Sequence, residues 1–439
     1  MFTLIWGITI NIGRPTAIVH GFQLPMTLKK HRRWIIYLIS CLLFTFSQFY
    51  RSSIAVISPN LVDDLNFDTE ELGLISATFF YAFAVMQIPV GLYLDSVGPR
   101  ILITVLSLVA VAGATIFAYG ESAAALIVGR LFLGVGMACN LMGPLKLITS
   151  WFSPLHFATL SAIFVSVGTA GNIAAATPLV WLTELLGWRT TFLLFAMCNL
   201  VITILFYLIA RDHPDDTPVG YPTTAKTVGF LVAMSGVKQL FSRRDYWLIS
   251  IGTFFRYGVY ASVQALWAGP FLMVTMGLSQ FMTGNLLLAM SIGLIIGSPI
   301  CGWISDSILR SRKSVIITGL VVMAGILITL SVLPGKAGLL ILFALFFGFG
   351  FSSGAGQIMY AHIKERMPLE NAGIAMTGIN FFTMIGVAFF LHGLGWAIKA
   401  FYPGGSLDPE ALRAAFVLFG ACLVLTGLLY SLTVDGKKS

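Results

Sequence analysis

Charged residues are scarce in this 439-residue chain: Asp, Glu, Lys and Arg make up only 10% of it, and hydrophobic residues make up 57%. A soluble domain carries about 25% charged residues, so this composition excludes a water-soluble enzyme. The five cysteines stand singly within apolar stretches, which gives no support to disulfides or a metal site. Because the apolar residues run from end to end, with a mean hydropathy of +0.91, the sequence predicts a chain that crosses a lipid bilayer many times.

Twelve apolar runs are long enough to cross the membrane as helices, since a helix needs about 20 residues to span the hydrocarbon core. They are roughly Trp34–Ser58, Leu72–Leu94, Ile101–Tyr119, Ala123–Met142, Ala158–Leu182, Thr191–Ala210, Trp247–Met273, Met282–Ile304, Ser314–Leu333, Gly338–Tyr360, Gly373–Ile398 and Leu412–Leu432. Lys and Arg gather at one set of span ends, whereas the first loop on the other side is acidic. The positive-inside rule then predicts that both termini are cytoplasmic, in an inner (cytoplasmic) membrane.

The chain divides into two repeats. At a constant offset of 211, Pro59 pairs with Pro270, Gly73 with Gly284, Gly91 with Gly302 and Asp95 with Asp306. The predicted organisation is a cytoplasmic segment over residues 1–33, a six-helix bundle over 34–210, a cytoplasmic loop over 211–245, a second bundle over 246–433 and a tail over 434–439. Residues 1–25 are too short to span and lack a cleavage site, so we expect translation to begin at Met26.

Two copies of one motif lie at the cytoplasmic ends of matching spans. The first is Gly91-Leu-Tyr-Leu-Asp95-Ser-Val-Gly98-Pro-Arg100, and the second runs from Gly302 through Asp306 to Arg310 and Arg312. They resemble the G-x-x-x-D-x-x-G/R-x-R/K signature of the major facilitator superfamily, and the resemblance covers Trp34 to Leu432. It implies an all-α membrane protein with twelve transmembrane helices in two pseudo-symmetric six-helix bundles.

The resemblance also assigns these residues to a gate. A glycine lets two helices approach, and an aspartate can meet a neighbouring helix N-terminus and nearby guanidinium groups. Ser96 and Pro99 depart from the signature, so the first copy is the weaker lock. Span four adds Arg130 and Gly134, which resemble the family's R-x-x-x-G motif. Arg130 has two readings: a fixed hydrogen bonder to carbonyls of other helices, or a residue that couples binding to transport.

Arg51 in span one and Arg256 in span seven are charges within the membrane, on spans that are repeat partners. Arg51 with Pro59 resembles the first helix of anion-handling members such as the organophosphate and anion:cation symporter groups, and Tyr81–Pro89 also resembles phagosomal nutrient transporters. The carboxylates nearest to mid-span, Asp95, Asp306 and Glu184, all lie at span ends. Since a buried guanidinium needs a partner, we expect the substrate to be a small organic anion. The alternative for Arg51 is that it only keeps a vestibule wet.

Polar side chains within spans are the other candidates for substrate contact or for hydrogen bonds across helices. They are Gln87, Asn140, Lys146, Asn172, Gln264, Trp267, Asn285, Gln357, Tyr360 and Asn380. His392 is the possible proton site, because it is the one mid-span group that titrates near neutral pH; otherwise the substrate carries the proton or exchanges with a counter-anion.

We therefore expect a monomeric secondary transporter that works by alternating access. It would take a small-molecule substrate within the lipid bilayer and need no cofactor, metal or nucleic acid. An efflux antiporter for drugs or metabolites and a non-transporting solute sensor are the alternatives.

Overall fold

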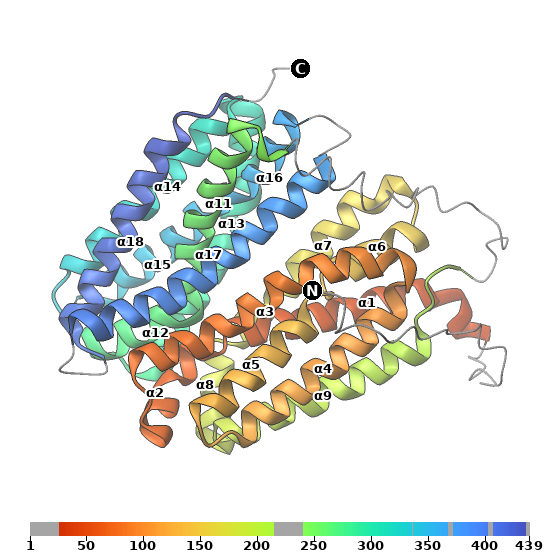
Figure 1. The fold of residues 1–439 in the computed structure, drawn as a ribbon, viewed down its shortest axis with the longest axis horizontal. Helices are drawn as coiled ribbons and strands as arrows, with labels where there is room; N and C mark the ends of the chain where they lie inside the picture. Colours follow the sequence, from red (N-terminus) through yellow and green to blue (C-terminus); the bar gives the residue numbers. More distant parts are fainter. Residues whose placement is uncertain (1–25, 215–239, 336, 368–371, 403–406, 436–439) are drawn as a thin grey trace, which may run out of the picture.

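The computed structural model describes residues 26–214, 240–335, 337–367, 372–402 and 407–435, and it is helical almost throughout these ranges (Figure 1). The prediction about residues 1–25 lies outside them. The first half of the chain contains α1 (Met26–Ser52), α2 (Ile54–Leu65), α3 (Thr69–Ser96), α4 (Pro99–Tyr119), α5 (Ala123–Met137), α6 (Met142–Trp151), α7 (Pro154–Ala174), α8 (Thr177–Leu186) and α9 (Trp188–Ile209).

The second half repeats the pattern with more irregular turns. It contains α11 (Arg244–Ser262), the π-helix η1 (Val263–Trp267), α12 (Ala268–Pro270), the π-helix η2 (Phe271–Thr275), α13 (Gln280–Trp303), the π-helix η3 (Ile304–Ile308), α14 (Arg312–Val332), α15 (Leu339–Ser353), the 3₁₀-helix η4 (Gly354–Gln357), α16 (Ile358–Arg366), α17 (Ala372–Phe401) and α18 (Pro409–Tyr430). Each of the twelve predicted spans falls on a helical segment of this order.

Several helices begin where the sequence supplies a side chain for the free backbone N–H groups of the first turn. Asp68 accepts a hydrogen bond from the Glu71 amide while the Glu71 carboxylate accepts one from the Asp68 amide, a capping box that starts α3. Ser279 caps α13, and Asp408 caps α18 just before Pro409. These caps place the predicted outer ends of the three spans.

Ten described helices are long and apolar enough to cross a membrane, and the pair α7–α8, bent by 44°, makes an eleventh. The remaining predicted span is the broken segment from α11 to η2. It holds Arg256 and contains two π-helices. Twelve spans therefore remain the best description of the chain.

The two halves use the same internal packing. In the first half α1 packs on α7, α3 on α5 and α4 on α9; in the second, α11 packs on α17, α13 on α15 and α14 on α18. This equivalence confirms the predicted repeat. The halves contact each other mainly through α3 against α17, α13 against α7 and α8, and α2 against η1 and α12. Figure 1 shows the orange helices of the first half meeting the green and blue helices of the second along this line.

Candidate functional site

Arg51 lies in the last turn of α1, where the two halves meet. Its side chain lines a cavity of about 20 Å³, large enough for about one water molecule. The other lining residues come from both halves: Gln48, Ser52, Phe80 and Asn172 from the first, and Tyr257, Ala261, Gln264 and Ala265 from the second. The cavity is therefore closed by groups that must separate when the halves move apart.

Arg51 is 8% exposed, and its guanidinium lies within hydrogen-bonding reach of the Tyr257 side chain. It lies over the Phe83 ring, with 4.3 Å from Cζ to the ring centroid, and interacts electrostatically with the phenols of Tyr257 and Tyr360. Its Nε is buried and has no hydrogen-bond partner among the described residues. Burial of a guanidinium without a carboxylate partner is costly, so Arg51 is suited to an incoming anionic acceptor.

Arg256 enters the same region from α11 and is 3% exposed. Its Nη1 donates to the Ser353 carbonyl at 2.8 Å and to the Ser353 hydroxyl at 3.2 Å, whereas its Nε has no partner in the described part of the chain. The guanidinium fills the space beside Gly356, where a Cβ atom would overlap its Cζ. The small-residue run from Ser352 to Gly356 was the sequence signal for this cradle, and the sequence analysis missed it.

The two arginines belong to one electrostatic unit. The phenol of Tyr360 interacts with both guanidinium groups, and its hydroxyl donates to Asn380 Oδ1 at 3.2 Å. Neither Arg51 nor Arg256 forms an ion pair with any described carboxylate. The oxygens around Arg256 are neutral, so the unit keeps its positive charge and has unsatisfied donors.

Arg130 is held differently, as a link between helices of the first half. It is fully buried, and its guanidinium donates to the carbonyls of Tyr50, Ile75 and Ser76 while it lies over the Phe79 ring. These are the contacts expected if Arg130 is a fixed hydrogen bonder to carbonyls of other helices, the first of the two alternatives given for it. A coupling role stays a prediction. Gly134, on the same helix, lies so close to the Phe79 carbonyl that a Cβ atom would clash.

The structure gathers only some of the other polar candidates around the arginines. Gln264 and Asn172 line the Arg51 cavity. Tyr360 interacts with the Arg51 guanidinium and donates a hydrogen bond to Asn380. The others make different contacts. Gln87 donates to the Phe83 and Ala138 carbonyls, Asn140 to the Leu43 carbonyl and Lys146 to the Leu94 carbonyl. Asn285 accepts from Thr177, Trp267 is fully buried and Gln357 is exposed.

His392 lies away from this group, on α17. Its backbone packs beside Gly73 of α3, where the two halves touch. A part in proton coupling stays a prediction for this residue.

The first copy of the sequence motif ends at the start of α4. Gly98 adopts a positive φ of 91°, and the Arg100 amide donates to Asp212 Oδ1 at 2.7 Å. The Arg100 side chain donates to the Tyr207 carbonyl. The Asp95 side chain lies outside the described residues. The carboxylate at this helix N-terminus is therefore Asp212, which the sequence analysis did not single out.

The second copy forms an ion-pair network. Arg312 pairs with Asp306 and with Glu365, the latter at 2.9 Å, and the Lys313 amide donates to Asp435 Oδ1 at 3.0 Å. Asp435 thus caps α14 as Asp212 caps α4, each accepting from the second residue of its helix. Arg310, by contrast, is exposed, with a positive φ of 46°.

The motif glycines do not play the part expected of them in this conformation. Among the described residues, no atom lies within 4 Å of a Cβ placed at Gly91 or at Gly302, so neither position requires glycine for a close helix approach here. The helices around them are not in contact at these points. Their gating role stays a prediction.

Contacts between the halves concentrate at the predicted outer ends of the helices. Lys399 of α17 pairs with Asp68 and Glu70 at the start of α3, at 3.0 and 2.8 Å. Gln280 donates to the Val56 carbonyl at 2.6 Å, and Gly73 brings α3 so near α17 that a Cβ atom would lie 2.6 Å from the Leu391 carbonyl oxygen. We call this set of contacts the outer seam.

Comparison with known proteins gives one consistent result. The family model of the Major Facilitator Superfamily matches residues 34–391. The hexuronate transporter of Bacillus subtilis is 25% identical over 86% of this chain and 89% of its own length, and the D-galactonate transporter of Escherichia coli is 24% identical over 88% and 92%. A bacterial homolog of the human lysosomal transporter Spinster, in an inward-facing and unoccupied conformation, matches with a TM-score of 0.75 at 17% identity, over 91% of this chain and 96% of that one.

Proposed function

Because the chain belongs to the Major Facilitator Superfamily, we propose that it is a secondary transporter for a small organic acid anion that works by alternating access. It is a multi-pass membrane transporter rather than an enzyme. The observation that carries the substrate class is the pair of buried arginines, one from each half, that no described carboxylate neutralises. A carboxylate offers two oxygens that match the guanidinium fork.

The relatives narrow the class further. The two transporters named above act on hexuronate and D-galactonate, which are sugar acids with one carboxylate and several hydroxyl groups. Next to the arginines this chain presents phenol and amide groups from Tyr257, Tyr360, Gln264 and Asn380. Such groups both donate and accept hydrogen bonds, so we propose that the carboxylate binds the arginines and the hydroxyls bind these side chains.

The proposed cycle follows from the placement of the two charges. Arg51 moves with the first half (residues 34–210) and Arg256 with the second (246–433), so an anion bound by both holds the halves together. With the outer seam closed, the site would exchange with the predicted cytoplasmic side. We further propose that both termini are cytoplasmic, that the protein acts as a monomer in the inner membrane, and that a proton or a counter-anion drives transport.

Binding and uptake by arginine variants test the substrate class. Galacturonate should raise the melting temperature of the purified protein, since a ligand stabilises the state that it binds, whereas neutral galactose should not. Each charged hydrogen bond contributes about 1.5–3 kcal/mol. Arg51→Gln and Arg256→Gln should therefore each weaken binding about 10- to 150-fold and abolish uptake into proteoliposomes.

Arg189→Gln is the matched control, because Arg189 forms an exposed ion pair with Asp64 and neither residue lines the Arg51 cavity. It should bind and transport as the unmodified protein does. Equal stabilisation by the neutral sugar, or normal uptake by both site variants, would overturn the anion assignment. Uptake of lipophilic compounds that does not depend on either arginine would instead favour the efflux alternative.

A further inference from the structure

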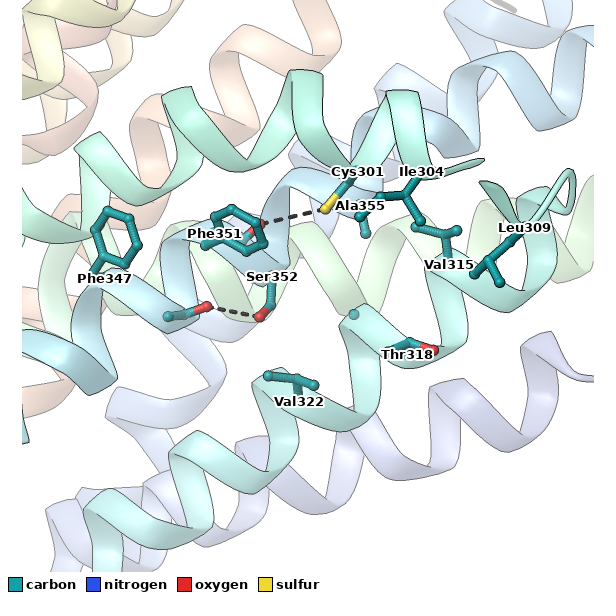
Figure 2. Close-up of a pocket in the computed structure, with 12 residues that line it drawn as sticks. Cys301, Ile304, Leu309, Val315, Thr318, Val322, Phe347, Phe351, Ser352 and Ala355 are labelled. Carbon is teal, nitrogen blue, oxygen red and sulfur yellow. Dashed lines mark hydrogen bonds between the residues drawn. The ribbon is translucent and has the colours of Figure 1, made fainter. Parts of the chain in front are cut away.

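A second and much larger cavity, of about 500 Å³, lies within the second half, between α13, η3, α14 and α15. Figure 2 shows Val315, Thr318 and Val322 along α14, with Phe347 and Phe351 across from them. Its volume falls in the range of about 300–1,000 Å³ that small-molecule sites occupy. Ser352 and Ala355 of the run beside Arg256 line this cavity, whereas Ser353 and Gly356, which contact that arginine, do not.

The cavity exists because α14 and α15 stand apart where their counterparts in the first half touch. There, α4 and α5 pack on glycine: a Cβ atom at Gly113 would lie 2.6 Å from the Leu133 amide nitrogen. In the second half a Cβ at Gly348, which lines the cavity, would meet only the end of the Ile326 side chain at 3.4 Å. The second half therefore departs here from the close packing of α4 on α5 in the first half.

The cavity opens toward the surface that faces lipid. Leu309 and Val322 line it and are 51% and 42% exposed, and α14 is one of the helices able to cross the membrane. Its walls are mostly hydrocarbon side chains. In a bilayer an apolar recess with such an opening favours occupation by an acyl chain, because the chain gains dispersion contacts on several sides.

The predicted inner end of the cavity carries positive charge. Leu309 is followed by Arg310, which is exposed, and Lys313 lies at the start of α14. The neighbouring Arg312 is already paired with Asp306 and Glu365. Arg310 and Lys313 form no ion pair with any carboxylate in the described ranges, although Asp435 binds the Lys313 amide. Basic side chains at this depth attract anionic headgroups of the cytoplasmic leaflet.

We propose that this cavity binds one acyl chain of an anionic phospholipid, whose headgroup phosphate lies against Arg310 and Lys313. The bound chain fills the space between α14 and α15 and takes the place of the direct helix contact that the first half has. The protein should then be more stable with such a lipid than without it. This site does not depend on the substrate proposed above.

Thermal unfolding of the delipidated full-length protein in detergent tests the proposal. Mixed micelles with phosphatidylglycerol should raise the melting temperature by several degrees more than micelles with phosphatidylcholine. Arg310→Gln should remove the difference between the two lipids. Gly348→Leu, whose side chain would occupy the cavity, should remove the stabilisation by both. Gly325→Leu is the matched control, because Gly325 is exposed on α14 with no atom near its Cβ position and does not line the cavity.

Native mass spectrometry of the unmodified protein and of Arg310→Gln gives a second measurement that needs no change in the helices. One phosphatidylglycerol should stay bound to the unmodified protein, and its occupancy should fall at least several-fold in the variant. Equal stabilisation by both lipids, full stabilisation of Gly348→Leu, or unchanged occupancy in Arg310→Gln would each overturn the proposal.

Discussion

A substitution at Gly73 should shift the equilibrium between the conformation with a closed outer seam and the conformation with an open one. In the outer seam a Cβ atom at this position would lie 2.6 Å from the Leu391 carbonyl oxygen, and ordinary contact begins at 3.4 Å. Gly73→Ala therefore forces α3 and α17 to separate by about 0.8 Å, the difference between these two distances. Overpacking of this kind costs about 1–3 kcal/mol. Because the contact joins the two halves, the cost falls on the conformation in which the outer seam is closed.

An energy change of this size moves a two-state equilibrium by about 5- to 150-fold toward the open seam. Distance measurements between spin labels at Asp63 of α2 and Phe281 of α13, both exposed and on opposite halves, should show a larger population at long distance. Gly393→Ala is the control, because Gly393 is on α17 but has no atom within 4 Å of its Cβ position. Distance distributions that are unchanged in Gly73→Ala, or equally changed in the control, would refute this account of the seam.

Three further perturbations test other parts of the structure. Arg130→Met removes three hydrogen bonds to buried carbonyls of neighbouring helices and should lower the free energy of unfolding by about 1–3 kcal/mol. A melting temperature equal to that of the unmodified protein would contradict the linking role. Asp212→Ala and Asp435→Ala each remove a helix cap and should each lower the free energy of unfolding by about 0.5–2 kcal/mol. In the same thermal unfolding experiments the Asn variants should lie closer to the unmodified protein. At the outer seam, burial raises the pKa of Asp68, but amide hydrogen bonds and Lys399 outweigh it and hold the pKa below its usual value of 3.8. The ionised, paired form of Asp68 therefore prevails above pH 3.8 and is lost as the pH falls through the lowered pKa, so the distance between the two spin labels should lengthen only in strong acid. Lys399→Gln should weaken this dependence of the label distance on pH. Lengthening that already occurs near pH 6 would contradict the role of the Asp68–Lys399 pair.

The sequence was enough to predict the membrane spans, the repeat and the two key charges. Apolar runs of sufficient length leave few alternatives in a bilayer, and a charge inside such a run is visible because it is rare, as with Arg51 and Arg256. The absence of carboxylates from mid-span could also be read directly. These features are local or depend on a fixed offset along the chain.

The partners of those charges could not be predicted in the same way. Ser353 and Gly356 meet Arg256 at the junction of α15 and η4, which the sequence does not mark. The capping roles of Asp212 and Asp435 depend on where the last helix of each half ends. The expectation of close approach at Gly91 and Gly302 came from residue type alone. Whether a glycine lies against another helix depends on the conformation of the transporter, which one sequence does not specify.

The helix α16 has a consequence for communication between binding and gating. Arg256 is held by Ser353 and Gly356 just before α16, and Glu365, which pairs with Arg312, lies next to its last residue. Its nine residues form a rod about 13 Å long. We expect a ligand that draws Arg256 toward itself to act on one end of this helix, whose other end lies beside the Arg312–Glu365 ion pair. Occupancy of the site would then reach that ion pair through a single short helix.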